Sequence, residues 1–187
     1  MKYVSTRDNT KEYNFEEVFI KGLADDGGLY VPKFIKKYTH QELLELKNLS
    51  YIDLSTKIIS QFLSDFISKE DLSSLVKKSY STFREKDVVK ISSIGKLKLL
   101  ELFHGPTLAF KDIAMQVIGN MYDIILKKNN SKINIVVATS GDTGAAAIDA
   151  MKNKKNIKIF VLHPYKKISE IQRKFMTTVD SNNVFNL

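Results

Sequence analysis

The chain has 187 residues, of which 43% are hydrophobic and 27% charged, so we expect a folded globular protein and not a disordered one. It contains no cysteine, which excludes disulfides, thiolate metal ligands and cysteine nucleophiles. The formal net charge is +8, but only Arg7, Arg84 and Arg173 are arginines and the lysines are scattered. This distribution favours a solvated lysine-rich surface over a nucleic-acid-binding face.

No stretch has the length and hydrophobicity of a membrane span, so we expect no membrane partner. Residues 1–26 carry scattered charges and no uninterrupted apolar run, which disfavours a signal peptide. A cytoplasmic location is therefore expected.

The first part of the chain predicts a short strand followed by helices. Apolar residues recur at helical spacing over residues 15–23 and again over 54–66. Between these segments, Thr39 and Glu42 fit a capping box that begins another helix. We expect residues 1–82 to form a small, mostly helical N-terminal domain.

The pattern then changes to strands and helices in alternation. The predicted elements are strands over 88–91 and 97–100, a helix over 112–128, a strand over 133–138, a helix over 143–152, a strand over 157–162, a helix over 169–178 and the start of a strand at 184–187. This order predicts a parallel sheet, and the run at 133–138 is typical of a buried parallel strand.

We expect residues 83–187 to be the first, incomplete part of a parallel-sheet α/β domain. Three strands of parallel type make a poor closed domain, so the chain is expected to be truncated. The alternative is a small but complete α/β domain.

The segment Glu101–Asp112, with the sequence ELFHGPTLAFKD, places Lys111 behind an aromatic residue at a predicted helix start. A lysine that is shielded from water there can act as a neutral amine, which forms a Schiff base with a carbonyl, whereas an ammonium cannot. The alternative is an ordinary surface lysine, which is the usual fate of this residue type.

A second segment, Ser140–Gly144, has the sequence SGDTG and lies between a predicted strand and a predicted helix. Its glycines allow a tight turn, and its hydroxyls and the helix N–H groups can hold an anion. The alternative is a simple helix cap made by Asp142 or Ser140. A reactive lysine together with an anion cradle suggests pyridoxal phosphate chemistry on an amino acid.

The three histidines do not by themselves indicate a metal site or a catalytic site. His40, His104 and His163 lack metal-ligand spacing, and no carboxylate is recognisable as their partner in the sequence. His104 gains interest only because it lies within the lysine segment.

Together, the two segments resemble the threonine synthase family of fold type II (tryptophan-synthase-β-like) pyridoxal phosphate enzymes. The resemblance extends to residues 3–7 and 22–32, which look like that family's N-terminal domain, and to residues 175–184 beyond the second segment. It therefore covers nearly the whole chain.

The resemblance implies roles for individual residues. Lys111 would form the Schiff base with pyridoxal 5'-phosphate and carry protons, and Phe110 and Asp142 would lie beside the cofactor. Ser140, Gly141, Asp142, Thr143 and Gly144 would hold the substrate carboxylate. His104 and Thr107 would line the site, and Arg7 is a weaker candidate. Asp142 replaces an asparagine of the wider superfamily, as it does in this branch of threonine synthases.

The implied activity is that of a pyridoxal-phosphate-dependent lyase that converts O-phospho-L-homoserine and water to L-threonine and phosphate, the last step of threonine biosynthesis. A monomer or homodimer is expected. The family binds the cofactor phosphate with a downstream glycine-rich loop, yet all eight glycines here lie at or before Gly144. This chain alone is therefore expected to be inactive.

Two rival hypotheses stay open at this point. A threonine-synthase-like phospholyase would keep the cofactor and eliminate phosphate without forming threonine. A non-catalytic paralogue would keep the fold and lose the chemistry.

Overall fold

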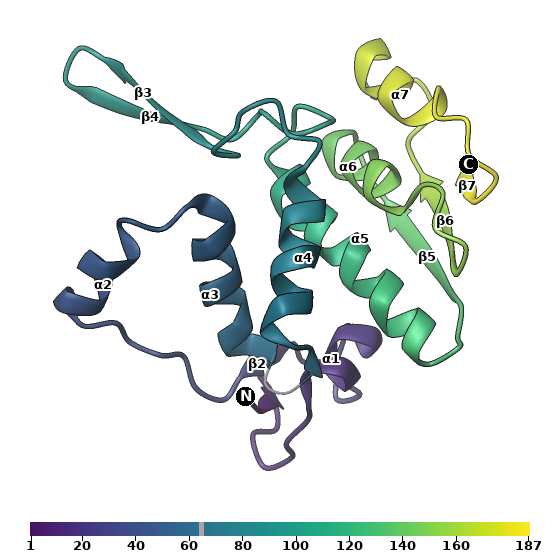
Figure 1. Ribbon diagram of the computed structural model, residues 1–187. Helices are drawn as coiled ribbons and strands as arrows, with labels where there is room; N and C mark the ends of the chain where they lie inside the picture. Colours follow the sequence, from purple (N-terminus) through teal and green to yellow (C-terminus); the bar gives the residue numbers. More distant parts are fainter. Residues whose placement is uncertain (64–65) are drawn as a thin grey trace. The chain divides into compact units, whose positions relative to one another are not determined.

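The computed structural model describes residues 1–63 and 66–187, and it divides into two units, Met1–Lys77 and Lys78–Leu187 (Figure 1). The described elements are β1 (Tyr3–Ser5), α1 (Phe15–Lys21), β2 (Tyr30–Pro32), α2 (His40–Leu46), α3 (Tyr51–Leu63), α4 (Lys69–Tyr80), β3 (Lys90–Ile94), β4 (Leu97–Glu101), α5 (Lys111–Lys128), β5 (Ile133–Ala138), α6 (Asp142–Met151), β6 (Ile157–Leu162), α7 (Glu170–Thr177) and β7 (Val184–Asn186). The predicted α/β class is confirmed, with its largely helical first part and the parallel sheet in its second.

The first unit is built around a small antiparallel sheet and an aromatic cluster. In the sheet, β1 pairs with β2 so that Val4 lies opposite Val31. The ring of Phe15 lies 6.4 Å from that of Tyr3 and 5.3 Å from that of Phe66, measured between centroids. The hydroxyl of Tyr3 donates to a backbone carbonyl of α3 at 2.8 Å, and thereby ties the sheet to that helix.

The predicted capping box of α2 is confirmed. The Thr39 hydroxyl accepts from the Glu42 backbone N–H at 3.2 Å, and the Glu42 carboxylate accepts from the Thr39 backbone N–H at 2.8 Å. These two bonds satisfy N–H groups that have no partner within the helix. Lys36 also contacts this carboxylate at 2.6 Å, and the hydrogen bond with Lys36 is the largest cause that lowers the pKa of Glu42 to about 2.

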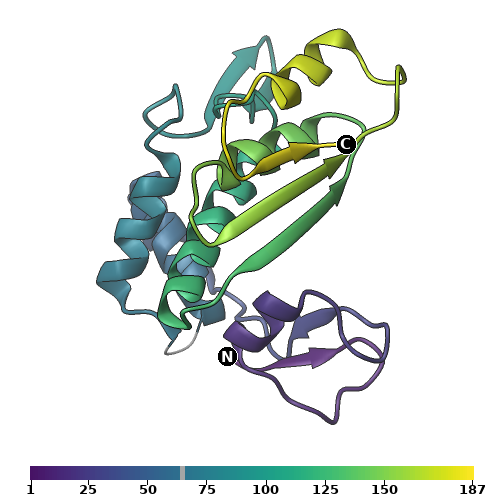
Figure 2. The same ribbon diagram turned by 90° about the vertical axis from the view of Figure 1, so that its right-hand side faces the viewer.

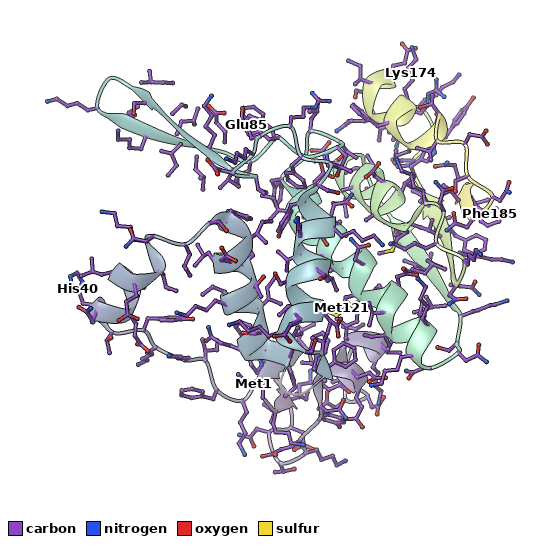
Figure 3. All side chains as sticks on the ribbon, in the orientation of Figure 1. Met1, His40, Glu85, Met121, Lys174 and Phe185 are labelled. Carbon is purple, nitrogen blue, oxygen red and sulfur yellow. The ribbon has the colours of Figure 1, made fainter. Side chains whose placement is uncertain are left out.

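The second unit contains a three-stranded parallel sheet in the order β5-β6-β7. Alternate residues of β6 are buried against the helices, and Ile157, Ile159 and Val161 join the core. That core also includes Leu126, Ala145, Ala147, Ile148, Met151 and Met176. Met121 of α5, labelled in Figure 3, is buried as well.

Strand β5 does not match the prediction of a strand buried on both faces. It lies at an edge of the described sheet, and its alternate residues are exposed, with 66% of Val136 accessible to solvent. Figure 2 shows α5 and α6 on one side of the sheet and the opposite face of the three strands turned toward the viewer. An apolar run alone could not reveal this, because burial on the second face depends on what else covers the sheet.

The β3–β4 hairpin also differs from the prediction at its start. The strand begins at Lys90 and not at Val88, which is buried with a φ of 63° and lies outside the ladder. Left-handed backbone is costly for a β-branched residue, so the propensity of valine for strands gave the wrong boundary here.

Candidate functional site

Lys111 is the first residue of α5 and follows a tight loop after β4. Within this loop the Leu108 N–H donates to the carbonyl of Gly105 at 3.2 Å, and Leu108 has a φ of 64°. The Gly105-Pro106 pair favours such a turn. The turn therefore carries the chain from the hairpin directly into the helix that begins with the lysine.

The carboxylate of Asp112 fastens this loop to the helix. It is fully buried, and it accepts the Thr107 backbone N–H at 2.8 Å and the Thr107 hydroxyl at 2.7 Å. Gly105 lies against the same side chain, because a Cβ at Gly105 would be only 2.5 Å from Asp112 Cβ. Burial raises the pKa of Asp112, and the two hydrogen bonds from Thr107 oppose that rise.

The side chain of Lys111 is half-buried and extends over its neighbour. Its Nζ lies 4.7 Å from the centroid of the Phe110 ring, and Phe110 itself is 58% exposed. The aromatic residue that precedes the lysine in the sequence therefore also lies close to its side-chain nitrogen in the structure. The Nζ end of the side chain therefore lies near an aromatic face at the N-terminal end of a helix.

His104 has a carboxylate partner, contrary to expectation. Its Nε2 lies 2.7 Å from Oε2 of Glu101, and both side chains are less than 15% exposed. Hydrogen bonds from Ser92 and then from His104 hold the pKa of Glu101 below its usual value. The pair is three residues apart across the end of β4. This spacing indicates a side-chain contact only within a helix, so nothing in the sequence indicated the pair.

The segment before α6 is organised by Thr139, which sequence reasoning missed. Its Oγ1 accepts the backbone N–H groups of Gly141 at 3.2 Å and Gly144 at 3.0 Å. The expected alternative of a cap by Ser140 or Asp142 is wrong, because the N-cap residue is Gly141 and the side chain that binds the first turn of α6 is that of Thr139. The sequence signal for this contact was the hydroxyl residue Thr139, two positions before Gly141.

Asp142 is held by a residue from α7. Its Oδ1 accepts from Nε2 of Gln172 at 3.0 Å. Gly141 has a φ of 153°, and a Cβ there would lie 2.5 Å from the same Nε2. Ser140 and Asp142 are exposed and Thr143 is half-buried, so the turn is accessible from solvent. Nothing in the sequence linked Gln172 to this turn.

Helices α5 and α6, which begin at the two motifs, lie side by side in Figures 1 and 2. Gln116 of α5 donates to Oδ2 of Asp149 of α6 at 2.7 Å. Gly119 permits a close approach, because a Cβ there would lie 2.5 Å from the carbonyl oxygen of Ala150. The lysine motif and the Ser140–Gly144 turn therefore belong to one packed assembly.

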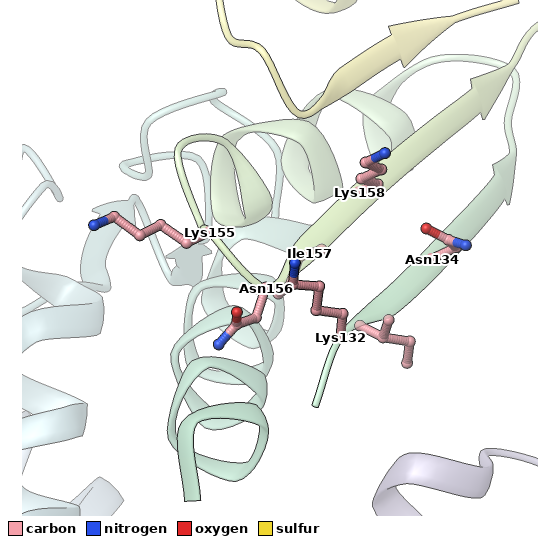
Figure 4. Close-up of a pocket in the computed structure, with 7 residues that line it drawn as sticks. Lys132, Asn134, Lys155, Asn156, Ile157 and Lys158 are labelled. Carbon is pink, nitrogen blue, oxygen red and sulfur yellow. The ribbon is translucent and has the colours of Figure 1, made fainter. Parts of the chain in front are cut away.

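A pocket of about 280 Å³ lies at the opposite end of the sheet, where β5 and β6 begin (Figure 4). It contains none of the predicted site residues, and Figure 4 shows its lysines extending in different directions. Its lining residues are Lys132, Ile133, Asn134, Lys155, Asn156, Ile157 and Lys158. Ligands of open parallel sheets bind at the carboxyl ends of strands, where Thr139 follows β5, so we place the candidate site there.

Within residues 1–63 and 66–187, no three histidine, aspartate or glutamate side chains are grouped to hold a metal ion. Among the helices in this same part of the chain, none combines the length and apolar character that a bilayer crossing needs.

Residues 2–80 match the family model described as threonine synthase N terminus. The whole chain is 40% identical over 188 residues to the threonine synthase of Pseudomonas aeruginosa and covers 40% of that protein.

Two solved structures match the complete chain and 40% of their own chains, each with a TM-score of 0.93. They are a PLP-bound threonine synthase from Brucella melitensis, 39% identical, and threonine synthase from yeast, 42% identical. The chain thus spans about two-fifths of the length of these relatives. In sequence and in fold, the chain is similar to the N-terminal portion of threonine synthases.

Proposed function

We propose that this chain provides the N-terminal part of a pyridoxal-phosphate-dependent threonine synthase, which converts O-phospho-L-homoserine and water to L-threonine and phosphate. The observation that carries the proposal is the position of Lys111, at the start of α5 behind a loop fastened by Asp112. The crystallised Brucella melitensis relative is described as PLP-bound, which supports the cofactor.

The residues around Lys111 fit such a cofactor. Lys111 would hold it covalently through Nζ, the exposed ring of Phe110 would lie beside it, and Asp142 would face it. The glycine at position 141 leaves free the space that a Cβ would fill beside Gln172. When bound, the pyridinium ring of the cofactor would store negative charge from the substrate.

The Ser140–Gly144 turn would hold the substrate carboxylate. The first N–H groups of a helix lack intrahelical partners and can bind an anion. In α6 the N–H of Gly144 already binds Thr139 Oγ1, so the backbone N–H groups of Asp142 and Thr143 would be the donors toward the carboxylate. The hydrogen bond from Gln172 fixes the position of the Asp142 side chain at this turn. The hydroxyls of Ser140 and Thr143 would add hydrogen bonds.

Lys111 would carry protons between substrate carbons, while phosphate leaves and water adds at the β-carbon. An amine freed from its bond can serve as base and acid in turn if its position is fixed. The fastened loop would supply that fixed position. His104, oriented by Glu101, and Thr107 would line the site.

A chimera tests the proposal. This chain would replace the matched N-terminal portion of the Pseudomonas aeruginosa enzyme, and threonine, 2-oxo acid and cofactor absorbance would be measured with O-phospho-L-homoserine. We expect threonine from the chimera and from its Lys132→Ala control, and none from Lys111→Ala. A 2-oxo acid without threonine would support the phospholyase. Cofactor binding without either product would support the non-catalytic paralogue.

A further inference from the structure

Helix α7 lies beside α6 (Figures 1 and 2) and contacts the Ser140–Gly144 turn through two residues, Gln172 and Met176. A Cβ at Gly141 would lie 2.5 Å from Nε2 of Gln172, and a Cβ at Gly144 would lie 2.7 Å from Sδ of Met176. Side chains four residues apart lie on the same face of a helix. The two glycines of the turn therefore fit against one face of α7.

Met176 fixes the position of this face. It is 0% exposed and belongs to the core of the second unit. Its backbone carbonyl accepts from Nδ2 of Asn186 at 3.1 Å, which joins α7 to β7. Gln172 is half-buried and lies one helical turn before Met176. Its side chain therefore reaches the turn from a helix that the core already holds in place.

The side-chain amide of Gln172 is held at both of its ends. Its Nε2 donates to Oδ1 of Asp142 at 3.0 Å, and its Oε1 accepts from the Ser169 hydroxyl at 3.1 Å. The Ser169 oxygen, at the N-cap of α7, also accepts from the Gln172 backbone N–H at 3.2 Å. An ionised carboxylate only accepts hydrogen bonds, so the NH₂ end of the amide must face Asp142. These bonds define one orientation for the amide and, through it, one for the Asp142 carboxylate.

The donors that the proposed function assigns to the substrate carboxylate, the backbone N–H groups of Asp142 and Thr143, follow directly after Gly141. Gly141 has a φ of 153°, a conformation that glycine adopts far more readily than other residues. Without Gln172, this backbone would lose the group that packs on it. The Asp142 side chain could then take other rotamers beside the same donors, where its charge would repel a second carboxylate.

We propose that Gln172 is a positioning residue for the substrate carboxylate: it packs on Gly141 and holds Asp142, and so keeps the two N–H donors in one arrangement. The inference deepens the proposed function and rests on it, because the ligand is the carboxylate of O-phospho-L-homoserine. Gln172 acts through the turn and not on the reacting atoms. Its loss should therefore weaken substrate binding more than it slows turnover.

The first test measures kcat and KM for O-phospho-L-homoserine in the chimera with the Pseudomonas aeruginosa enzyme. Gln172→Leu removes the amide and keeps a side chain of similar volume, so it should raise KM by about tenfold and change kcat by less than about threefold. The matched control is Thr177→Val, on the same helix, where an exposed hydroxyl donates to the Arg173 carbonyl. It should leave both constants within about twofold of the parent. A parental KM in Gln172→Leu would overturn the proposal.

A second variant separates positioning from a simple loss of stability. Gln172→Glu places a carboxylate opposite that of Asp142, so its KM at neutral pH should exceed that of Gln172→Leu. As pH falls, one of the two facing carboxylates takes up a proton and can donate it across the contact. The ratio of its KM to that of the parent should therefore decrease as pH falls. A ratio that is independent of pH would count against the proposal.

A measurement without cofactor or substrate separates this inference from the proposed function. In the purified chain, NMR couplings across the Cα–Cβ bond report the rotamer of Asp142. We expect one rotamer in the parent and in Thr177→Val, and a mixture in Gln172→Leu. A single rotamer in all three would overturn the inference. An inactive parent chimera would overturn the proposed function instead, and the couplings would still decide whether Gln172 holds the turn.

Discussion

The buried carboxylate of Asp112 binds both the backbone N–H and the hydroxyl of Thr107, and so joins the loop in front of Lys111 to the first turn of α5. Asp112, the residue after the proposed catalytic lysine, therefore helps to fix the position of that lysine. This arrangement lets the loop be tested without touching Lys111 itself.

Thr107→Val should lower the free energy of unfolding by about 1–3 kcal/mol, because it removes one donor to a buried carboxylate and keeps the shape of the side chain. Thr107→Ser keeps the hydroxyl and should stay closer to the parent. Urea unfolding followed by circular dichroism measures both. A valine variant as stable as the parent would show that the hydroxyl does not fasten the loop.

Asp112 should make stability depend on pH in an unusual direction. Its pKa is raised above the ordinary 3.8 by burial, so the unfolded chain loses this proton first as pH rises. The parent should therefore lose stability relative to Asp112→Asn as pH rises from 3.8 through the raised value, and the difference should then level off. Unfolding midpoints at a series of pH values measure this. The opposite slope would contradict the cause given.

The contribution of Glu101 to stability should depend on pH in the opposite direction. Its pKa is lowered from 4.5, with Ser92 as the largest cause and His104 next. Its contribution to stability is present above pH 4.5 and is lost as pH falls through the lowered value. Ser92→Ala should move this pKa up toward 4.5, whereas Ser93→Ala should not. Carboxyl-carbon NMR titration distinguishes the two, and an unchanged value in Ser92→Ala would disprove the assignment.

The purified 187-residue chain with pyridoxal phosphate should form no measurable threonine from O-phospho-L-homoserine. The reason is that all eight of its glycines lie at or before Gly144, whereas the family resemblance implies a glycine-rich phosphate loop further along. A coupled phosphate-release assay and amino-acid analysis provide the measurement. Threonine formed by the wild-type chain and not by Lys111→Ala would refute this prediction.

Much of the fold follows from local sequence signals. The capping box at Thr39 and Glu42 and the strands at 133–138 and 157–162 were correctly placed, because caps and apolar periodicity act over a few residues. The start of β3 was misplaced because Val88 adopts left-handed backbone that its side chain disfavours. The division at residues 82 and 83 stays a prediction.

The candidate site was only partly predictable. The motifs identified Lys111 and the Ser140–Gly144 turn, and their roles stay predictions. Gln172, thirty residues beyond Asp142, could not be found because the sequence carries no signal for contacts between separate helices. The two bonds from Thr107 to the oxygens of Asp112 were not predicted either, because they depend on the fold of the loop before the helix.

The close contact between Gly119 and Ala150 has a consequence for how sequences of this family can diverge. Main-chain atoms, and not side chains of adjustable size, set the spacing between α5 and α6 at that point. Core substitutions elsewhere can therefore accumulate while the two helices keep their separation. A larger residue at position 119 would force α5 and α6 apart and would displace the motifs at the starts of both helices. We therefore expect Gly119 to be substituted more slowly than the surrounding apolar residues.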